Sequence, residues 1–128
     1  MDDEEIPAAG FELDHRTCLV LLVSERVGRL VEGSPTLAVT PVRYSVTGDR
    51  VSVVGIDGGL PPGRSGDRIV LEVDGIDEQR QVGWSVVVRG YLETSASGDQ
   101  LDITELALTG RWVRGSYRVP PSDDRGYL

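Results

Sequence analysis

The stretch that decides the fold is Q-V-G-W-S-V-V-V-R-G-Y-L-E, residues 81–93. It is a run of β-branched residues with a glycine near each end, which is typical of a strand. Successive side chains of a strand point to opposite faces, which gives two sets: Trp84, Val86 and Val88 on one face, and Ser85, Val87 and Arg89 on the other. Both faces are mostly apolar, so we expect a barrel interior on one side and a helix or a second subunit on the other.

Arg89 is the charged residue of this strand, and partial burial would require an acidic or anionic partner. One interpretation is a structural ion pair with a carboxylate such as Glu72 or Asp74. The other is an anionic ligand. All 13 basic residues of the chain are arginine, so such a ligand would be held by guanidinium groups, hydroxyls or backbone N–H groups, and Schiff-base chemistry by a lysine is excluded.

Short turn signals separate β-branched runs from residue 27 onward, which is typical of an all-β sheet or barrel. The pattern predicts strands near residues 28–32, 36–46, 50–56, 67–75, 81–95 and 101–113. Turn residues at 33–35, 47–49 and 97–99 predict antiparallel hairpins. Pro41 lies inside the second predicted strand, where it cannot donate to a ladder, and it predicts a sheet edge or a bulge.

One helix is predicted before the strands. Asp14 is a suitable N-cap, and the apolar spacing continues to about Arg26, with Gly28 as a stop. The residues at helical spacing are Leu19, Leu22, Val23 and Arg26. Cys18 is the single cysteine and lies in the apolar run 18–23, so we expect a buried, reduced thiol and no disulfide.

Length and composition predict one domain. A chain of 128 residues with 39% hydrophobic content can build one core. We expect flexible tails at residues 1–10 and 120–128 around a domain at 11–119. The Gly/Pro/Ser-rich segment 57–66 is long enough to shape the mouth of a ligand site.

Charge and hydropathy exclude several partners. The net charge of -8 argues against nucleic acid, and the apolar run 18–23 is far too short for a membrane span, so a cytoplasmic, soluble protein is expected. The lone His15 supports no catalytic triad. The acidic cluster near Asp77 lacks the spacing of a calcium loop, and no metal site is predicted. No catalytic residue can be assigned.

Residues 72–90, E-V-D-G-I-D-E-Q-R-Q-V-G-W-S-V-V-V-R-G, resemble the central signature of the pyridoxamine 5'-phosphate oxidase-like proteins, the FMN-binding split-barrel superfamily. Other stretches fit the same family: V-G-R-L-V at 27–31, Pro35, T-P-V-R-Y at 40–44 and L-T-G-R-W at 108–112. Together they cover roughly residues 11 to 113. The arginine-rich composition is similar to that of the small actinobacterial members.

The resemblance implies a mainly β fold, a six-stranded antiparallel split β-barrel with one N-terminal helix. It also implies a homodimer with FMN, or a deazaflavin, in a groove between the subunits, and an oxidoreductase acting on a small molecule. By alignment, the cofactor-facing positions are Arg43 and Tyr44 beside the isoalloxazine, Val54, Gly55 and Ile56 toward the phosphate, and Trp84 and Arg89 near the ends of the central strand.

The chain departs from the family at the phosphate. Leu60 stands where a lysine is usual, with Asp57 nearby, and this exchange is expected to weaken phosphate binding by several kcal/mol. Arg64 or Arg68 would have to substitute. The segment 94–101 is a tight turn where relatives insert a helix, so the groove loses one wall. Two alternatives therefore stay open: a split-barrel dimer that does not hold flavin tightly and binds another ligand, and a structural module.

Overall fold

The computed structural model describes residues 5–6, 9–33, 36–114 and 117–118. Its elements, in chain order, are β1 (Glu5–Ile6), β2 (Ala9–Glu12), α1 (His15–Ser24), β3 (Val27–Glu32), β4 (Ala38–Thr47), β5 (Arg50–Gly55), β6 (Arg68–Asp77), β7 (Val82–Thr94), β8 (Leu101–Arg114) and β9 (Tyr117–Arg118). The six predicted strands correspond to β3 through β8, with ends within a few residues of those predicted.

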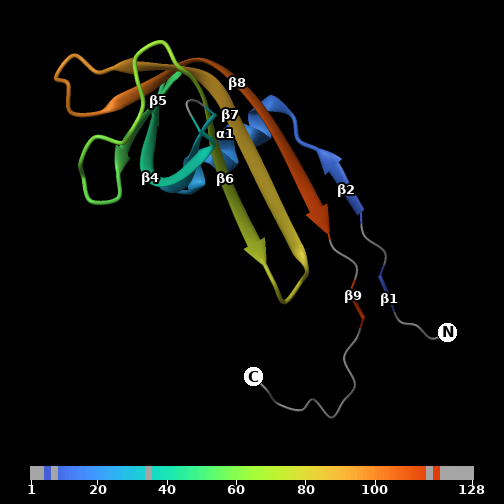
Figure 1. Ribbon diagram of the computed structural model, residues 1–128. Helices are drawn as coiled ribbons and strands as arrows, with labels where there is room; N and C mark the ends of the chain where they lie inside the picture. The colour runs from blue at the N-terminus through green and yellow to red at the C-terminus, as the bar shows by residue number, and fades with distance from the viewer. Residues whose placement is uncertain (1–4, 7–8, 34–35, 115–116, 119–128) are drawn as a thin grey trace.

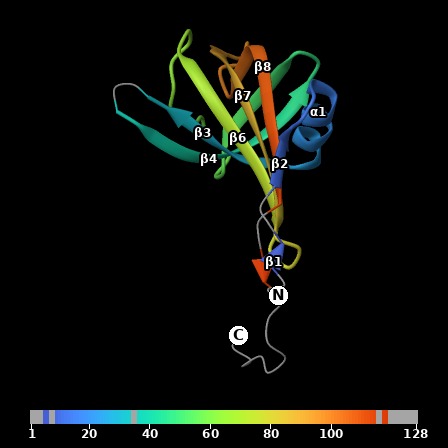
Figure 2. The same cartoon turned by 90° about the vertical axis from the view of Figure 1, so that its right-hand side faces the viewer.

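These six strands close into an antiparallel barrel (Figures 1 and 2). The order is β8-β5-β4-β3-β6-β7, and β7 pairs back onto β8 along almost its whole length. The predicted fold class is therefore confirmed: the protein is mainly β, with a closed six-stranded barrel and one helix in the described residues. The interior is filled by side chains from every barrel strand, among them Leu30, Val42, Val53, Leu71 and Val88, all at 0% exposure.

The hairpins follow the turn residues. Thr47 pairs with Arg50 across a two-residue turn in which Gly48 has a φ of 60°, a conformation that glycine adopts without strain. Thr94 pairs with Leu101 around a turn that contains Gly98. The turn between β3 and β4 includes residues 34–35, which lie outside the described residues.

Pro41 lies in the part of β4 that pairs with β3 alone. It faces Arg29 of β3, whereas the pairing with β5 begins one residue later at Val42. The missing N–H of the proline therefore removes no bond from the β4–β5 ladder. The predicted edge position is confirmed for this half of the strand.

Helix α1 packs against β8 (Figure 2). On the edge opposite β7, β8 pairs with β5 through Leu101–Ile103 and with β2 through Arg111–Arg114, and its residues between these two pairings have no strand partner on that edge among the described residues. A Cβ at Gly110 of β8 would lie 2.6 Å from Cys18 Sγ. The glycine thus lets the helix approach the strand closely.

The helix begins as predicted and ends earlier. The Asp14 carboxylate accepts a hydrogen bond from the Thr17 N–H at 2.8 Å, and α1 ends at Ser24 rather than near Arg26. The helix buries a different face from the predicted one. Cys18 and Leu22 are buried, whereas Val23 is 64% exposed, because the helix turns the 18/22 stripe toward β8 and β4.

Strand β2 extends the sheet beyond the barrel and was not predicted. It pairs with the end of β8, where the Phe11 and Trp112 rings stack with centroids 5.0 Å apart. Figure 1 shows β6, β7 and β8 running past the short barrel strands toward β1 and β9. Most of the predicted tail residues, 1–4, 7–8 and 120–128, lie outside the described residues, so the flexibility of the tails stays a prediction.

Candidate functional site

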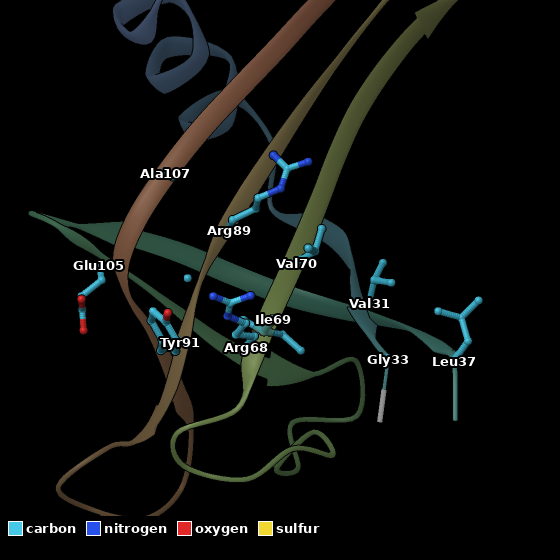
Figure 3. A pocket seen from close by; sticks show the side chains of 11 residues that line it. Val31, Gly33, Leu37, Arg68, Ile69, Val70, Arg89, Tyr91, Glu105 and Ala107 are labelled. Carbon is cyan, nitrogen blue, oxygen red and sulfur yellow. The ribbon is translucent and has the colours of Figure 1, made fainter. Parts of the chain in front are cut away.

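A cavity of about 560 Å³ lies on the outer face of the barrel. Figure 3 shows the side chains that line it, which come from β3, β6, β7, β8 and the segment before β4. The volume falls in the range of sites that hold a small molecule or cofactor. The lining is mostly apolar, with Arg68, Arg89 and Glu105 as its charged residues.

The floor of the cavity is a row of directly paired residues. Val31 of β3 pairs with Val70 of β6, Val70 with Arg89 of β7, and Arg89 with Ala107 of β8. Because paired residues of neighbouring strands point to the same face, these four side chains form one continuous band. Leu37, which is 80% exposed, borders its β3 end.

Two guanidinium groups stand on this apolar band. Arg68 is paired with Tyr91 across the β6–β7 ladder, and Arg89 donates a hydrogen bond to Thr109 Oγ1 at 3.0 Å. Neither arginine forms an ion pair with a carboxylate of the described residues. The two cations therefore give the cavity a binding potential for an anionic group.

The structural ion pair predicted for Arg89 is wrong. Arg29 of β3, not Arg89, bridges Glu72 and Asp74, at 2.8 and 2.9 Å. The reason is register, because Arg29 is directly paired with Glu72, whereas Arg89 lies one row away and pairs with Val70. Partial burial, and then the neighbouring Asp74, raise the pKa of Glu72 above its usual value even though Arg29 opposes this shift.

A β-bulge closes the β8 end of the cavity. The pairing of β7 with β8 shifts between Arg89 and Tyr91, which leaves Glu105 of β8 in a left-handed conformation with a φ of 56°. A Cβ at Gly90 would lie 2.5 Å from the Thr104 carbonyl oxygen, so the bulge requires glycine there. In Figure 3 the Tyr91 side chain lies between Arg68 and Glu105.

Four predicted residues lie elsewhere on the barrel. Arg43 is exposed on β4 and pairs with Val54 of β5, which ends at Gly55, and Ile56 lies in the turn that follows. In the sheet order, β4 and β5 lie on the other side of β3 from β6 and β7, and none of these four residues lines the cavity. The structure therefore brings Arg68 and Arg89 together but does not join them with Arg43 and Val54 within one chain.

Tyr44 is a core residue, which corrects its expected place beside the isoalloxazine. It is 7% exposed, and its hydroxyl donates a hydrogen bond to the Leu22 carbonyl oxygen of α1. Burial raises the pKa of the Tyr44 phenol well above its usual range. Side chains alternate along β4, and this alternation turns the Tyr44 side chain into the core rather than toward a ligand.

Trp84 is half-buried, and its indole covers Gly75 of the paired strand.

The segment after β5 forms a tight turn with an acidic side chain. The Gly55 N–H donates to the Gly59 carbonyl oxygen at 2.7 Å, and the Gly59 N–H donates to Asp57 Oδ1 at 2.9 Å. Leu60, in the place of the usual lysine, is 53% exposed. Arg64 lies further along the loop and is not among the residues that line the cavity, so of the two predicted substitutes Arg68 is the one positioned there.

Two residues that line the cavity, Tyr91 and Glu105, were not predicted from the sequence. Tyr91 belongs to the quoted strand, and its row could have been read from the alternation. Glu105 could not, because the bulge shifts the alternation by one residue.

Within the described part of the chain, no three histidine, cysteine or carboxylate side chains gather as a metal site. No helix there combines the length and apolarity needed to cross a bilayer.

Solved structures share this fold. A protein described as the FAD binding protein from Mycobacterium smegmatis is 25% identical, with a TM-score of 0.66 over 81% of this chain and 98% of that one. An FAD-binding protein from Mesorhizobium loti is 18% identical, with a TM-score of 0.65 over 83% and 98% of the two chains. A search of the curated proteins found no match. The family model for pyridoxamine 5'-phosphate oxidase matches residues 14–126, so the predicted family is confirmed and the chain belongs to it.

Proposed function

We propose that the chain binds a flavin in the outer cavity and acts as a flavin-dependent oxidoreductase on a small molecule. The observation that carries this proposal is the pair of cations, Arg68 and Arg89, on an otherwise apolar band. A flavin combines a large planar ring with an anionic tail, and the cavity likewise combines apolar surface with two guanidinium groups. The similarity to a flavin-binding protein at 25% identity supports the same ligand class.

The residues fit the two parts of a flavin in different ways. Val31, Val70 and Leu37 offer apolar surface for a ring, and guanidinium groups bind phosphate through paired N–H donors. The bound flavin would supply hydride or electron transfer. The chain would hold the phosphate through Arg68 and Arg89 and limit the access of water to the ring face.

We also propose that a second copy of the chain covers this face. The apolar band continues onto β4, where Val39 pairs with Val31 and is 59% exposed. Together with Leu37 it leaves apolar surface at the rim of the cavity in a single chain. A partner subunit would bury this apolar surface. It would also cover the side of the flavin ring that a single chain leaves exposed. Light scattering of the purified protein tests this: a dimer supports the proposal, and a monomer at micromolar concentration rejects it.

A second function is favoured by the turn after β5. Asp57 places a carboxylate, and Leu60 an apolar side chain, where family members grip the phosphate. A barrel with this turn could hold an anionic aromatic ligand other than flavin, with Arg68 and Arg89 as its anchors. The cavity would be the same, and the two proposals differ in whether flavin binds.

Flavin titration distinguishes them. Protein is titrated into FMN and into a deazaflavin while the fluorescence of each is followed. We expect saturable quenching with at least one of them, and about a tenfold loss of affinity in Arg68→Ala, as for a lost charged hydrogen bond. Arg64→Ala is the matched control, because Arg64 lies outside the cavity, and it should bind as the wild type does. Absence of quenching with either flavin would reject the first proposal and leave the second.

A further inference from the structure

We propose that a second cavity of the chain binds an organic cation, a small molecule that joins an ammonium group to an apolar body. This inference goes beyond the proposed function and does not rest on flavin binding, because the residues that carry it line a different space. Its support comes from the volume of the second cavity, from the carboxylates that line it and from the leucines of its wall.

The second cavity adjoins the outer cavity at β8. It has a volume of about 450 Å³, which is enough for a small molecule. It is bordered by the start of α1, the β4–β5 turn, the end of β7 and the first half of β8. Glu105 lines both cavities, and Figure 3 shows it at the end of the outer cavity opposite Leu37. The two cavities are therefore neighbours.

Three carboxylates from three parts of the chain line the second cavity. Asp49 comes from the β4–β5 turn, Glu93 from β7 and Glu105 from β8. None of the three forms an ion pair with an arginine of the described residues. Carboxylates that converge on one enclosed space favour a cation there and disfavour a phosphate or a carboxylate ligand.

The basic residues of the lining do not cancel this charge. The Arg50 guanidinium lies 3.1 Å from the carboxylate of Asp102, which is outside the lining, so these two charges offset each other. His15, at the start of α1, can add at most one positive charge. The three carboxylates therefore leave the cavity with an excess of negative charge.

The pairing of β7 with β8 supplies a separate observation that points to a cation. Glu93 is directly paired with Asp102, and like charges placed directly opposite each other destabilise a sheet. Asp102 accepts hydrogen bonds from three side chains, whereas no side chain of the described residues donates to Glu93. An ammonium group bound beside Glu93 would supply the missing donor and relieve the repulsion.

The apolar wall distinguishes an organic cation from a metal ion. Leu19 of α1 and Leu106 and Leu108 of β8 line the cavity, and the two β8 leucines pack against the core, which fixes their position. An apolar body would gain free energy by covering these side chains, and a metal ion would not. Within the part of the chain that the structure describes, no three potential metal ligands gather at one point.

The experiment compares probes of similar size and different charge by calorimetry. The probes are phenethylammonium, the neutral phenethyl alcohol and the anion hydrocinnamate, with Mg²⁺ as a purely ionic probe. We expect phenethylammonium to bind about tenfold or more tightly than the alcohol, and the anion not to bind. Equal binding of the ammonium and the alcohol, a preference for the anion, or displacement of the ammonium by equimolar Mg²⁺ would overturn the inference.

Two charge variants test the carboxylates. Glu93→Gln and Asp49→Asn should each lower the affinity for phenethylammonium about tenfold and leave that for the alcohol unchanged. Glu25→Gln is the matched control, because it removes the same charge from an exposed residue after α1 that lies outside the cavity; it should change neither affinity. An equal loss in Glu25→Gln would assign the effect to net charge and reject the site.

A further pair of variants tests the apolar wall. Leu19→Asn should weaken the binding of both phenethylammonium and the alcohol, because both lose the same apolar contact. Val20→Asn changes a residue of the same helix that is 62% exposed and outside the lining, and it should affect neither. Equal effects of the two variants would contradict a ligand against Leu19.

Melting temperatures separate a binding role of Glu93 from a structural one. Glu93→Gln should melt no lower than the wild type without ligand, since it removes the like charge opposite Asp102. A lower melting temperature would show that Glu93 supports the fold and would overturn its assignment to a ligand. Failure of the chain to bind flavin would reject the proposed function and leave this inference standing.

Discussion

Gly90 shows how one residue shapes the cavity. A Cβ there would lie 2.5 Å from the Thr104 carbonyl oxygen and 2.6 Å from Ile103 Cγ2, so the bulge in β8 depends on the absence of a side chain. We expect Gly90→Ala to lower the free energy of unfolding by about 1–3 kcal/mol, as for an overpacked site. Urea denaturation measures it. Gly33→Ala is the control, because no atom lies within 4 Å of the added methyl group; a similar loss there would contradict the steric explanation.

Asp102 is a buried carboxylate with three side-chain partners. It accepts hydrogen bonds from Ser52 Oγ at 2.8 Å, Arg50 Nη1 at 3.1 Å and Gln100 Nε2 at 3.3 Å. We predict that Asp102→Ala destabilises the fold by about 2–3 kcal/mol, because three hydrogen bonds to a buried carboxylate are lost. Arg50→Ala should cost less than about 1 kcal/mol, since its guanidinium is half exposed. Thermal melts of both variants test this, and a larger loss in Arg50→Ala would contradict it.

The raised pKa of Glu72 should make the stability of the fold depend on pH. Because its pKa is raised in the folded state, the folded chain binds this proton more tightly than the unfolded chain. Its contribution to stability is therefore full below the ordinary value near 4.5 and is lost as the pH rises through the raised pKa. Glu72→Gln should gain melting temperature relative to the wild type between about pH 4 and pH 7. A difference that stays constant with pH would reject this.

The residues of the site could be predicted in part, and the reason differs for each. Arg89 was singled out as the charged residue of an apolar strand, and Arg68 as a substitute for the lysine that Leu60 replaces. Tyr44 was placed by family alignment on the ligand side, but its position in β4 points it into the core. The ion partner of Arg29 depends on the register between β3 and β6, which are separated by two intervening strands in the sequence and which local patterns do not specify.

Among the elements, α1 depends on its contact with β8. Cys18 is fully buried against Gly110, and burial raises the pKa of its thiol. We predict that a thiol reagent such as DTNB reacts with Cys18 only as fast as the helix detaches or the chain unfolds. Stoichiometric reaction within seconds under native conditions would show that α1 is not held against the barrel.

Strand positions were predictable because alternating β-branched residues and glycine-containing turns act locally. The turns at Gly48 and Gly98 use glycine in conformations that it favours, and each hairpin forms where its turn residues predict. Strand β2 was not predictable in this way. It is four residues long and exists through its pairing with β8, which is a long-range contact.

On the scale of the molecule, closure is the feature that creates the site. Strands β7 and β8 pair along almost their whole length, which brings Ala107 and Glu105 beside Arg89 and so joins the β3–β6 face to the β8 face. The resemblance predicted this barrel from residues 72–90 and three shorter stretches. It did not predict the cavity, because the usual phosphate grip is replaced and the charges that remain lie on β6 and β7.

The most direct test of flavin binding in the outer cavity is a two-dimensional ¹⁵N NMR titration of the protein with FMN. If the flavin occupies the outer cavity, the amide signals of Arg68, Arg89 and Tyr91 should shift saturably with FMN, with little change at Arg64. Shifts confined to Arg43 and to Ile56 in the turn after β5, or no shifts at millimolar FMN, would contradict flavin binding in the outer cavity.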